Sequence, residues 1–363
     1  MHSCNGSKLM NATYLGENLI FIISQPRSGS TLLQRILFGH PEVQTSAETW
    51  LMLHPVYSLR KTGITAEYDT RFAYGGVEEF LQNYTHGPEV QLNAIREWAR
   101  TIYQDAIDKH NKHYFLDKTP RYFYIIPELY RLFPKAKFVF LLRNPMAVLA
   151  SELSTYVKTD WPILGVFKAD LLSAPGWILD GIDLLGENSY VIHYERFVAD
   201  PENSIQALCD YLKLDFHEPM LDYSNTPKPV GNYNDPTGIN QHTKPRTGSV
   251  DKWRNMVSND QALYFAQCYL ASLGEDTITR LGYDYQELFR TLHSRIISKN
   301  PLDPWSIAIQ PKLQWTFRQH FLSDLYFNRR DQGWMKGTLS TTRKHLKKAI
   351  RTIRREFSSP AVM

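Results

Sequence analysis

The segment FIISQPRSGSTLLQRIL, residues 21–37, constrains the fold of this chain more than any other stretch. The apolar run Leu19–Ser24, whose second part opens this segment, is typical of a buried strand. Leu32–Leu37 has apolar residues at helical spacing, and only the polar turn Pro26–Thr31 separates it from the strand. A strand, a tight turn and a helix start in direct succession favour an α/β fold with an anion site at the turn.

The turn contains the groups that an oxyanion needs. The first N–H groups of a helix have no partner within the helix, and the helix dipole is positive at that end. Gly29 lets the backbone come close to a ligand, Arg27 offers a guanidinium fork, and Ser28, Ser30 and Thr31 offer hydroxyls. The alternative is an ordinary helix that Ser28 or Ser30 caps, with nothing bound.

The turn does not match a nucleoside-triphosphate P-loop, which requires the pattern G-x-x-x-x-G-K-[ST]. If Gly29 is taken as the second glycine, Ser24 stands at the position of the first and Ser30 at that of the lysine. The missing lysine disfavours a kinase or NTPase, although a nucleotide or metabolite kinase stays as a rival interpretation.

The rest of the chain alternates apolar strands with amphipathic helices, which predicts an α/β fold with a central parallel sheet flanked by helices. Further strands are expected at 114–117, 137–143 and 189–193, and helices at 87–110, 125–132, 145–153, 203–213 and 260–273. In the helix 87–110 we expect an inward face with Leu92, Ile95, Trp98, Ala99, Ile102 and Ala106. We expect an extension at 1–18, a main domain at 19–290 and a helical extension with a basic tail at 291–363. The stretch 227–248 is expected to be a long loop.

The net charge and the number of cysteines limit the class of protein to which this chain can belong. Residues 329–363 contain ten Lys and Arg against two acidic residues, so a total charge of +4 leaves −4 for residues 1–328. No apolar run reaches the roughly 18 residues of a membrane span, and the N-terminus lacks the apolar core of a signal peptide. The three cysteines are isolated, which indicates a reducing compartment without disulfides or a zinc site. We therefore expect a cytoplasmic protein.

Pro26–Thr31 fits the form P-[KR]-S-G-[ST]-T throughout, and in this respect the chain resembles sulfotransferases that use 3′-phosphoadenylyl sulfate, PAPS. The version with Arg27 is similar to that of tyrosylprotein sulfotransferases and many bacterial members. The resemblance covers about residues 19–285 and implies that Arg27, Ser28, Gly29, Ser30 and Thr31 form a P-loop-like 5′-phosphosulfate site.

Further motifs carry the same resemblance. KFVFLLRNPMAVLASEL places Arg143 and Ser151 at the family's spacing, which implies binding of the 3′-phosphate. VIHYERFVADPENSIQALCDYLKLDF resembles the family's strand–Tyr-Glu–helix pattern, which implies that Tyr194 contacts the nucleotide. HTKPRTGSVDKWRN resembles two late PAPS-binding segments, one with Lys244 as the ligand and the other with Arg246 and Gly248. The sequence leaves this choice open.

Two segments resemble those that carry the family's catalytic groups. HPEVQTSAETW makes Glu48 the candidate base that takes the acceptor's proton, with His54 as a rival. FLDKTPRY makes Lys118, together with Arg27, the candidate group that stabilises charge on the sulfate and the bridging oxygen. The alternatives are an acid near a helix start for Glu48 and a surface lysine for Lys118.

The resemblance implies a PAPS-dependent transfer of a sulfuryl group, without a metal, to a hydroxyl rather than an amine of a small or medium-sized acceptor such as a natural product, carbohydrate or lipid. A second rival is a non-catalytic protein that binds PAPS or its product PAP. The tyrosylprotein enzymes are membrane-anchored and use disulfides, and this chain shows neither feature. Oligomeric state stays open.

The tail Thr341–Phe357 has apolar residues at helical spacing among basic ones, namely Leu346, Ala349, Ile350, Ile353 and Phe357. We favour a solvated helix that packs on the body through this stripe. The alternative is weak contact with an anionic membrane surface. No nucleic-acid-binding signature is present, so no nucleic-acid partner is expected.

Overall fold

The computed structural model describes residues 13–158, 160–224, 226–231, 243–297 and 332–358, with isolated positions between 301 and 329, and describes side chains as far as residue 346. The chain divides into two compact units, Met1–Ala308 and Ile309–Met363. The first unit contains the sheet and all the candidate site residues. The second contains the helix α14 (Trp334–Ser358).

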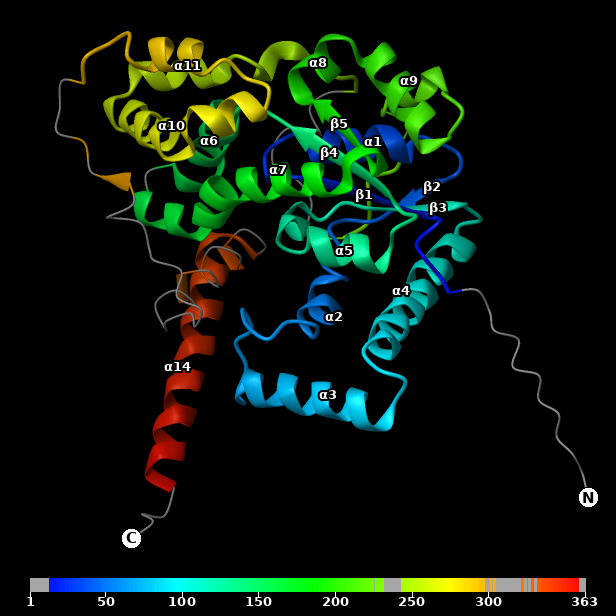
Figure 1. The fold of residues 1–363 in the computed structure, drawn as a ribbon. Helices are drawn as coiled ribbons and strands as arrows, with labels where there is room; N and C mark the ends of the chain where they lie inside the picture. The colour runs from blue at the N-terminus through cyan, green and yellow to red at the C-terminus, as the bar shows by residue number, and fades with distance from the viewer. Residues whose placement is uncertain are drawn as a thin grey trace, which may run out of the picture. The chain divides into compact units, whose positions relative to one another are not determined.

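The first unit is built on one five-stranded sheet in the order β2-β3-β1-β4-β5, and every pair of neighbours is parallel. Its strands are β1 (Leu19–Ser24), β2 (Val43–Thr45), β3 (Tyr114–Asp117), β4 (Lys137–Leu142) and β5 (Ser189–His193) (Figure 1). The predicted central parallel sheet is confirmed. The strand β2 was not predicted, because three residues are too few to show the alternation of a strand.

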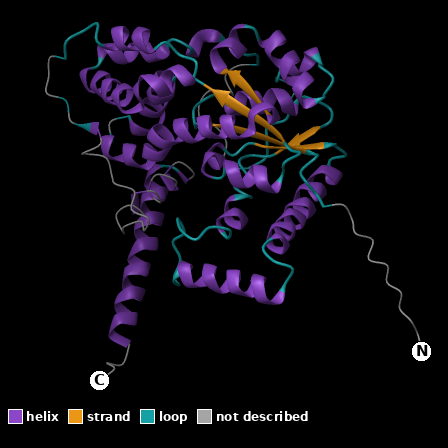
Figure 2. Cartoon of the chain, in the orientation of Figure 1, coloured by secondary structure: helices purple, strands orange, loops and turns teal. Residues whose placement is uncertain are grey.

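Helices cover both faces of the sheet (Figure 2). Leu19, Phe21 and Ile23 of β1 pack on one face against α4 (Glu89–Lys109), α5 (Ile126–Leu132) and α7 (Ala174–Leu185). Ile20 and Ile22 pack on the other face against α1 (Ser30–Phe38), α8 (Tyr194–Ala199) and α9 (Pro201–Leu212). Because β1 is buried on both faces, it is a continuous apolar run without polar alternation.

A third apolar cluster includes Trp253, which belongs to the stretch 242–255 that we call the late segment. It joins α6 (Pro145–Glu152), α10 (Asp260–Arg280), α11 (Tyr285–Leu292) and the 3₁₀ helix Lys252–Ser258. The remaining longer elements are α2 (Leu53–Tyr57) and α3 (Thr70–Tyr84), which follow β2. Of the predicted loop 227–248, residues 232–242 lie outside the described residues.

The predicted inward face of the long helix was wrong in part. The helix forms as α4, but Trp98 and Ile102 are 41% and 38% exposed, whereas Tyr103 and Ile107 are buried. The inward stripe runs from Leu92, Ile95 and Ala99 to Tyr103 and Ile107, and the hydroxyl of Tyr103 donates a hydrogen bond to the buried carboxylate of Asp117 at 2.7 Å. A buried polar partner of this kind leaves no periodic signal in the sequence.

In the tail, α14 includes the predicted helix, and Leu346 is 60% exposed. The side chains of Ala349, Ile350, Ile353 and Phe357 lie outside the described ones, so the packing of the stripe stays a prediction.

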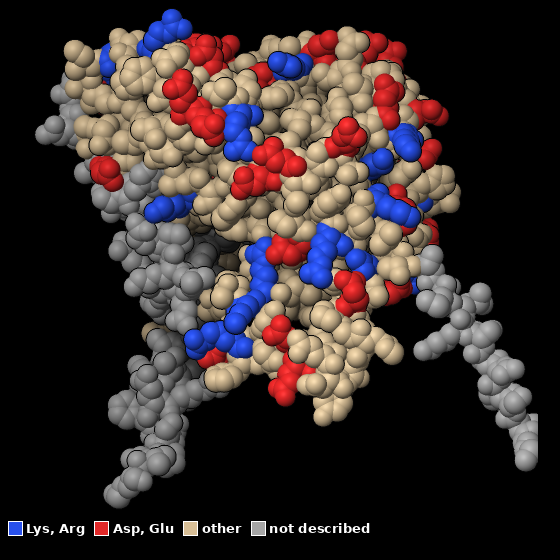
Figure 3. All heavy atoms as spheres, in the orientation of Figure 1, with Lys and Arg blue, Asp and Glu red and all other residues tan. Residues whose placement is uncertain are grey.

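Figure 3 shows Lys and Arg interspersed with Asp and Glu on the face that it draws.

Cys209 and Cys268 are free thiols. In the described part of the chain no single helix has the length and hydropathy of a membrane span. The helices Trp161–Phe167 and Ala169–Asn188 reach these values only as a pair, with a bend of 51° between them.

Candidate active site

The candidate residues gather at one edge of the sheet. Arg27 and Glu48 come three residues after β1 and β2, and Lys118, Arg143 and Tyr194 come directly after β3, β4 and β5. Because the carboxyl ends of parallel strands meet at the same edge, the fold brings these five positions together, around the central strand where ligands bind in open α/β sheets.

The strand order also divides these positions into two groups. β2 and β3 lie on one side of β1, and β4 and β5 lie on the other. Glu48 and Lys118 therefore approach the turn after β1 from one side, and Arg143 and Tyr194 approach it from the opposite side.

The turn after β1 leads directly into α1 without a side-chain cap. Gly29 is the N-cap residue with a φ of 93°, and Arg27 also has a positive φ, of 68°. The alternative in which Ser28 or Ser30 caps the helix is therefore wrong. A Cβ on Gly29 would lie 2.5 Å from the ring of Tyr194, so both the backbone conformation and the close approach require glycine.

Arg27 joins this turn to the helix after β4. Its Nε donates a hydrogen bond to Oγ of Ser151 at 3.1 Å, and its guanidinium carbon lies 5.5 Å from the centre of the Tyr156 ring. Its carbonyl accepts a hydrogen bond from Nη1 of Arg143 at 2.7 Å. The two motifs recognised in the sequence are thus in direct contact.

Arg143 lies between the turn and the late segment. Its Nη2 donates to the carbonyl of Ser249 at 3.1 Å, and its guanidinium carbon lies 4.4 Å from the centre of the Tyr194 ring. The Tyr194 hydroxyl is 2.7 Å from Oγ of Ser249. Burial lowers the pKa of Arg143 from its usual value, so this site holds a desolvated cation that an anion would stabilise.

Two carboxylates from neighbouring elements, Glu195 and Glu152, do not form an ion pair with Arg143. Glu195 accepts hydrogen bonds from the backbone N–H of Asn144 at 2.9 Å and from the hydroxyl of Tyr283 at 2.8 Å. Both oxygens of Glu152 are buried and lack a partner within the described residues.

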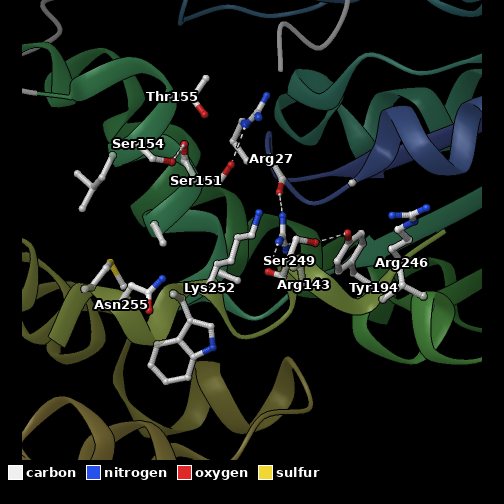
Figure 4. Close-up of a pocket in the computed structure, with 18 of the residues that line it drawn as sticks. Arg27, Arg143, Ser151, Ser154, Thr155, Tyr194, Arg246, Ser249, Lys252 and Asn255 are labelled. Carbon is white, nitrogen blue, oxygen red and sulfur yellow. Dashed lines mark hydrogen bonds between the residues drawn. The ribbon is translucent and has the colours of Figure 1, made fainter. Parts of the chain in front are cut away.

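These residues line a cavity of about 1310 Å³, which we call the basic pocket (Figure 4). Its lining includes Arg27, Gly29, Arg143, Ser151, Tyr194, Lys244, Arg246, Gly248, Ser249, Lys252 and Trp253. In Figure 4, Ser151 lies on one side of Arg143, whereas Tyr194 and Arg246 lie on the other. The volume exceeds the roughly 300–1,000 Å³ of ordinary small-molecule pockets, so it can accommodate a nucleotide.

The late segment contributes all three of its candidates to the basic pocket. Lys244, Arg246 and Gly248 are part of the lining, and Nζ of Lys244 is 3.9 Å from a carboxylate oxygen of Asp222. Sequence reasoning missed Ser249, although it stands next to Gly248 in the segment that the resemblance singled out.

Glu48 and Lys118 form an ion pair beside the turn. Nζ of Lys118 is 3.2 Å from Oε1 of Glu48 and 3.5 Å from Oγ1 of Thr31. Lys118 is only 1% exposed, so the surface-lysine alternative is wrong, whereas the side chain of Glu48 is 22% exposed. His54 is exposed on α2. The arrangement places a cation and a partly accessible carboxylate next to the proposed anion site.

Two buried polar atoms at this site lack a partner within the described residues, namely Oγ of Ser28 and Nε of Arg143. Buried polar groups are normally hydrogen-bonded, so unpartnered donors at a cationic turn point to a ligand with oxygen acceptors. This donor set fits phosphate and sulfate groups. Within the described residues no group of three or more His, Cys, Asp or Glu could hold a metal ion.

A model of the sulfotransferase family matches residues 19–218, which are 200 of the 363 residues of this chain. The chain belongs to the sulfotransferase family. The resemblance that the motifs indicated is thereby confirmed.

Individual relatives agree with this assignment. Nodulation protein NoeE from Sinorhizobium fredii is 30% identical over 213 residues, which are 52% of this chain and 48% of that protein. This chain therefore spans about half the length of NoeE. A putative protein-tyrosine sulfotransferase from Caenorhabditis briggsae is 26% identical over 274 residues, covering 72% of this chain and 90% of the relative.

Among solved structures, the sulfotransferase domain of the Synechococcus PCC 7002 olefin synthase is similar to this chain, with 24% identity and a TM-score of 0.49. The likeness covers 76% of this chain and 98% of that domain.

Proposed function

We propose that this enzyme transfers a sulfuryl group from PAPS to a hydroxyl, rather than an amine, of a small or medium-sized acceptor. The observation that carries the proposal is the position of Lys118, whose Nζ lies 3.2 Å from Glu48 and 3.5 Å from Thr31 of the anion site. It links a carboxylate that can accept a proton to the turn that can hold a phosphosulfate.

The donor would be held at both ends. Arg27, Ser28, Gly29, Ser30 and Thr31 would bind the 5′-phosphosulfate through side chains and helix N–H groups. Arg143 and Ser151 would bind the 3′-phosphate, and Tyr194, Lys244, Arg246 and Gly248 would complete the nucleotide site. The desolvated Arg143 and the unpartnered Oγ of Ser28 support this assignment.

When bound, PAPS supplies the sulfuryl group, whose bond to the bridging phosphate oxygen breaks as its bond to the acceptor oxygen forms, which leaves PAP. Glu48 takes the proton that the acceptor loses. Arg27 and Lys118 provide fixed positive charge where negative charge grows on the departing phosphate. The protein therefore contributes by positioning the reactants and by stabilising the charge that develops.

The acceptor side is formed by the β2 and β3 half of the edge, because Glu48 lies there and the nucleotide contacts lie on the other half. Release of PAP from PAPS tests the proposal, with phenols, sugars and long-chain alcohols offered as acceptors. We expect PAP release that requires an acceptor and that falls at least 100-fold in Glu48→Gln. PAP release that no acceptor increases would contradict it.

A further inference from the structure

A buried carboxylate lies at the end of β3 and is not part of the proposed chemistry. Oδ2 of Asp117 accepts hydrogen bonds from the hydroxyls of Tyr103 at 2.7 Å, Thr49 at 2.7 Å and Tyr122 at 2.9 Å. Its Oδ1 accepts one from Thr119 at 3.2 Å. We call these five residues the Asp117 cluster.

The cluster has an unusual composition for a protein interior. Asp117 is 0% exposed, and its side-chain partners in the described part of the chain are these four hydroxyls, with no Lys, Arg or His among them. A buried carboxylate without a cation is less favourable for the free energy of folding than apolar packing at the same place. The presence of Asp117 therefore indicates a role other than stability. Four hydroxyl donors match a carboxylate, which is an acceptor only.

The Asp117 cluster forms hydrogen bonds to an irregular segment that belongs to no strand. Residues 48–52 lie between β2 and α2, and Trp50 has a positive φ of 54°. The N–H of Trp50 donates to Oγ1 of Thr119 at 3.2 Å, and the N–H of Met52 donates to the hydroxyl of Tyr122 at 3.1 Å. The N–H of Leu51 donates to Oγ1 of Thr49 at 3.1 Å.

Both groups that the proposed chemistry requires on the acceptor side are neighbours of this cluster in the chain. Glu48 precedes Thr49, and Lys118 follows Asp117. One carboxylate therefore connects the segment that carries the candidate base to the strand end that carries the candidate cation.

We propose that Asp117 is a positioning residue that sets the geometry of Glu48 relative to Lys118, acting through Thr49 and the backbone of residues 49–52. This inference rests on the proposed function for its catalytic consequence, but not for the positioning itself. Burial raises the pKa of Asp117, and the four hydroxyl hydrogen bonds oppose that rise.

The chain offers a matched pair of substitutions to test it. Thr49→Val and Tyr103→Phe each remove one hydroxyl that lies 2.7 Å from the same oxygen of Asp117. Only Thr49 belongs to the segment that carries Glu48, whereas Tyr103 belongs to α4. A purely structural cluster predicts that both variants lose stability and that neither loses kcat selectively.

The positioning role predicts different consequences. In Thr49→Val, kcat for PAP release should fall about 10- to 100-fold while the dissociation constant of PAP stays within about twofold of wild type. Tyr103→Phe should lose a similar amount of thermal stability but less than about threefold in kcat. Thr49→Ser, which restores the hydroxyl, should restore kcat. Equal losses of kcat in Thr49→Val and Tyr103→Phe would overturn the proposal.

Hydrogen–deuterium exchange of the free protein separates this inference from the proposed function, because it requires no substrate. Amides of residues 49–52 should exchange at least about tenfold faster in Thr49→Val than in Tyr103→Phe. Equal exchange in the two variants would overturn the positioning role even in an active enzyme. If the wild type neither binds PAP nor consumes PAPS, the proposed function fails, and the exchange data still decide whether the Thr49 hydroxyl holds the segment.

Discussion

The backbone carbonyl of Arg27 accepts a hydrogen bond from the guanidinium of Arg143 at 2.7 Å. The two residues are 116 positions apart in the chain and follow adjacent strands, β1 and β4. The contact ties the turn that would hold the phosphosulfate to the residue that would hold the 3′-phosphate. A change at either residue should therefore affect both ends of the donor.

Gly29→Ala should weaken PAP binding strongly. The alanine would have to adopt a φ near 93°, and its Cβ would lie 2.5 Å from the ring of Tyr194, so the turn or the ring must move. We expect PAP affinity to fall at least about 100-fold in calorimetric titration. Gly75→Ala in α3 is the control, because a Cβ there meets no atom within 4 Å. PAP binding unchanged in Gly29→Ala would contradict the account of the turn.

Ser151→Ala should weaken PAP binding moderately. The hydroxyl accepts a hydrogen bond from Nε of Arg27 at 3.1 Å and is the proposed partner of the 3′-phosphate. Loss of one such hydrogen bond costs about 1–2 kcal/mol, which corresponds to about 5- to 30-fold in the dissociation constant. Ser154→Ala, which changes a hydroxyl that donates to the Ser151 carbonyl at 3.3 Å, serves as a comparison within the same pocket. A larger loss in Ser154→Ala than in Ser151→Ala would assign the 3′-phosphate to another place.

Lys118→Met should lower kcat far more than it weakens PAP binding. The thioether side chain has similar length and suits a position that is 1% exposed, but it removes the cation that contacts Glu48 and Thr31. We expect a fall of about 100-fold or more in kcat in steady-state kinetics, because fixed charge at a reacting centre is usually worth that much. Wild-type turnover in this variant would exclude Lys118 from the chemistry.

Glu152→Gln should change how stability depends on pH. Both carboxyl oxygens of Glu152 are buried without a partner in the described residues, and burial, aided by Asp170, raises its pKa from 4.5 to about 8. A raised pKa in the folded state gives stability that is complete below pH 4.5 and is lost as pH rises through about 8. The amide cannot ionise, so the variant should lack this loss.

The measurement for Glu152 is thermal unfolding of wild type and variant between pH 5 and pH 9. The advantage of Glu152→Gln should grow with pH, to at most about 5 kcal/mol by the conversion of a pKa difference into free energy. Parallel stability curves for the two proteins would show that Glu152 keeps the same protonation state in the folded and unfolded chain.

The sequence allowed much of the sheet and the donor site to be predicted. β1, β3 and β5 were predicted with the observed bounds because each is a short apolar run between breakers, and β4 differed by one residue. The strand-end positions of Arg27 and Arg143 followed from those strands.

Other features depend on contacts that have no local pattern. The Asp117 cluster was missed because Tyr103, Tyr122 and Thr49 look like ordinary helix or loop residues until the fold brings their hydroxyls to one carboxylate. The choice among Lys244, Arg246 and Gly248 could not be made from spacing, and all three line the basic pocket. Ser249 contacts Arg143 through its backbone carbonyl, and a backbone contact carries no residue signature.

Calorimetric titration with PAP, beside ATP with Mg²⁺, tests the central claim most directly, in wild type and in Arg143→Ala. We expect micromolar binding of PAP that weakens at least about 100-fold in the variant, with no measurable binding of ATP and Mg²⁺. Tight binding of ATP and Mg²⁺ without binding of PAP would contradict the PAPS-dependent function and would favour a kinase.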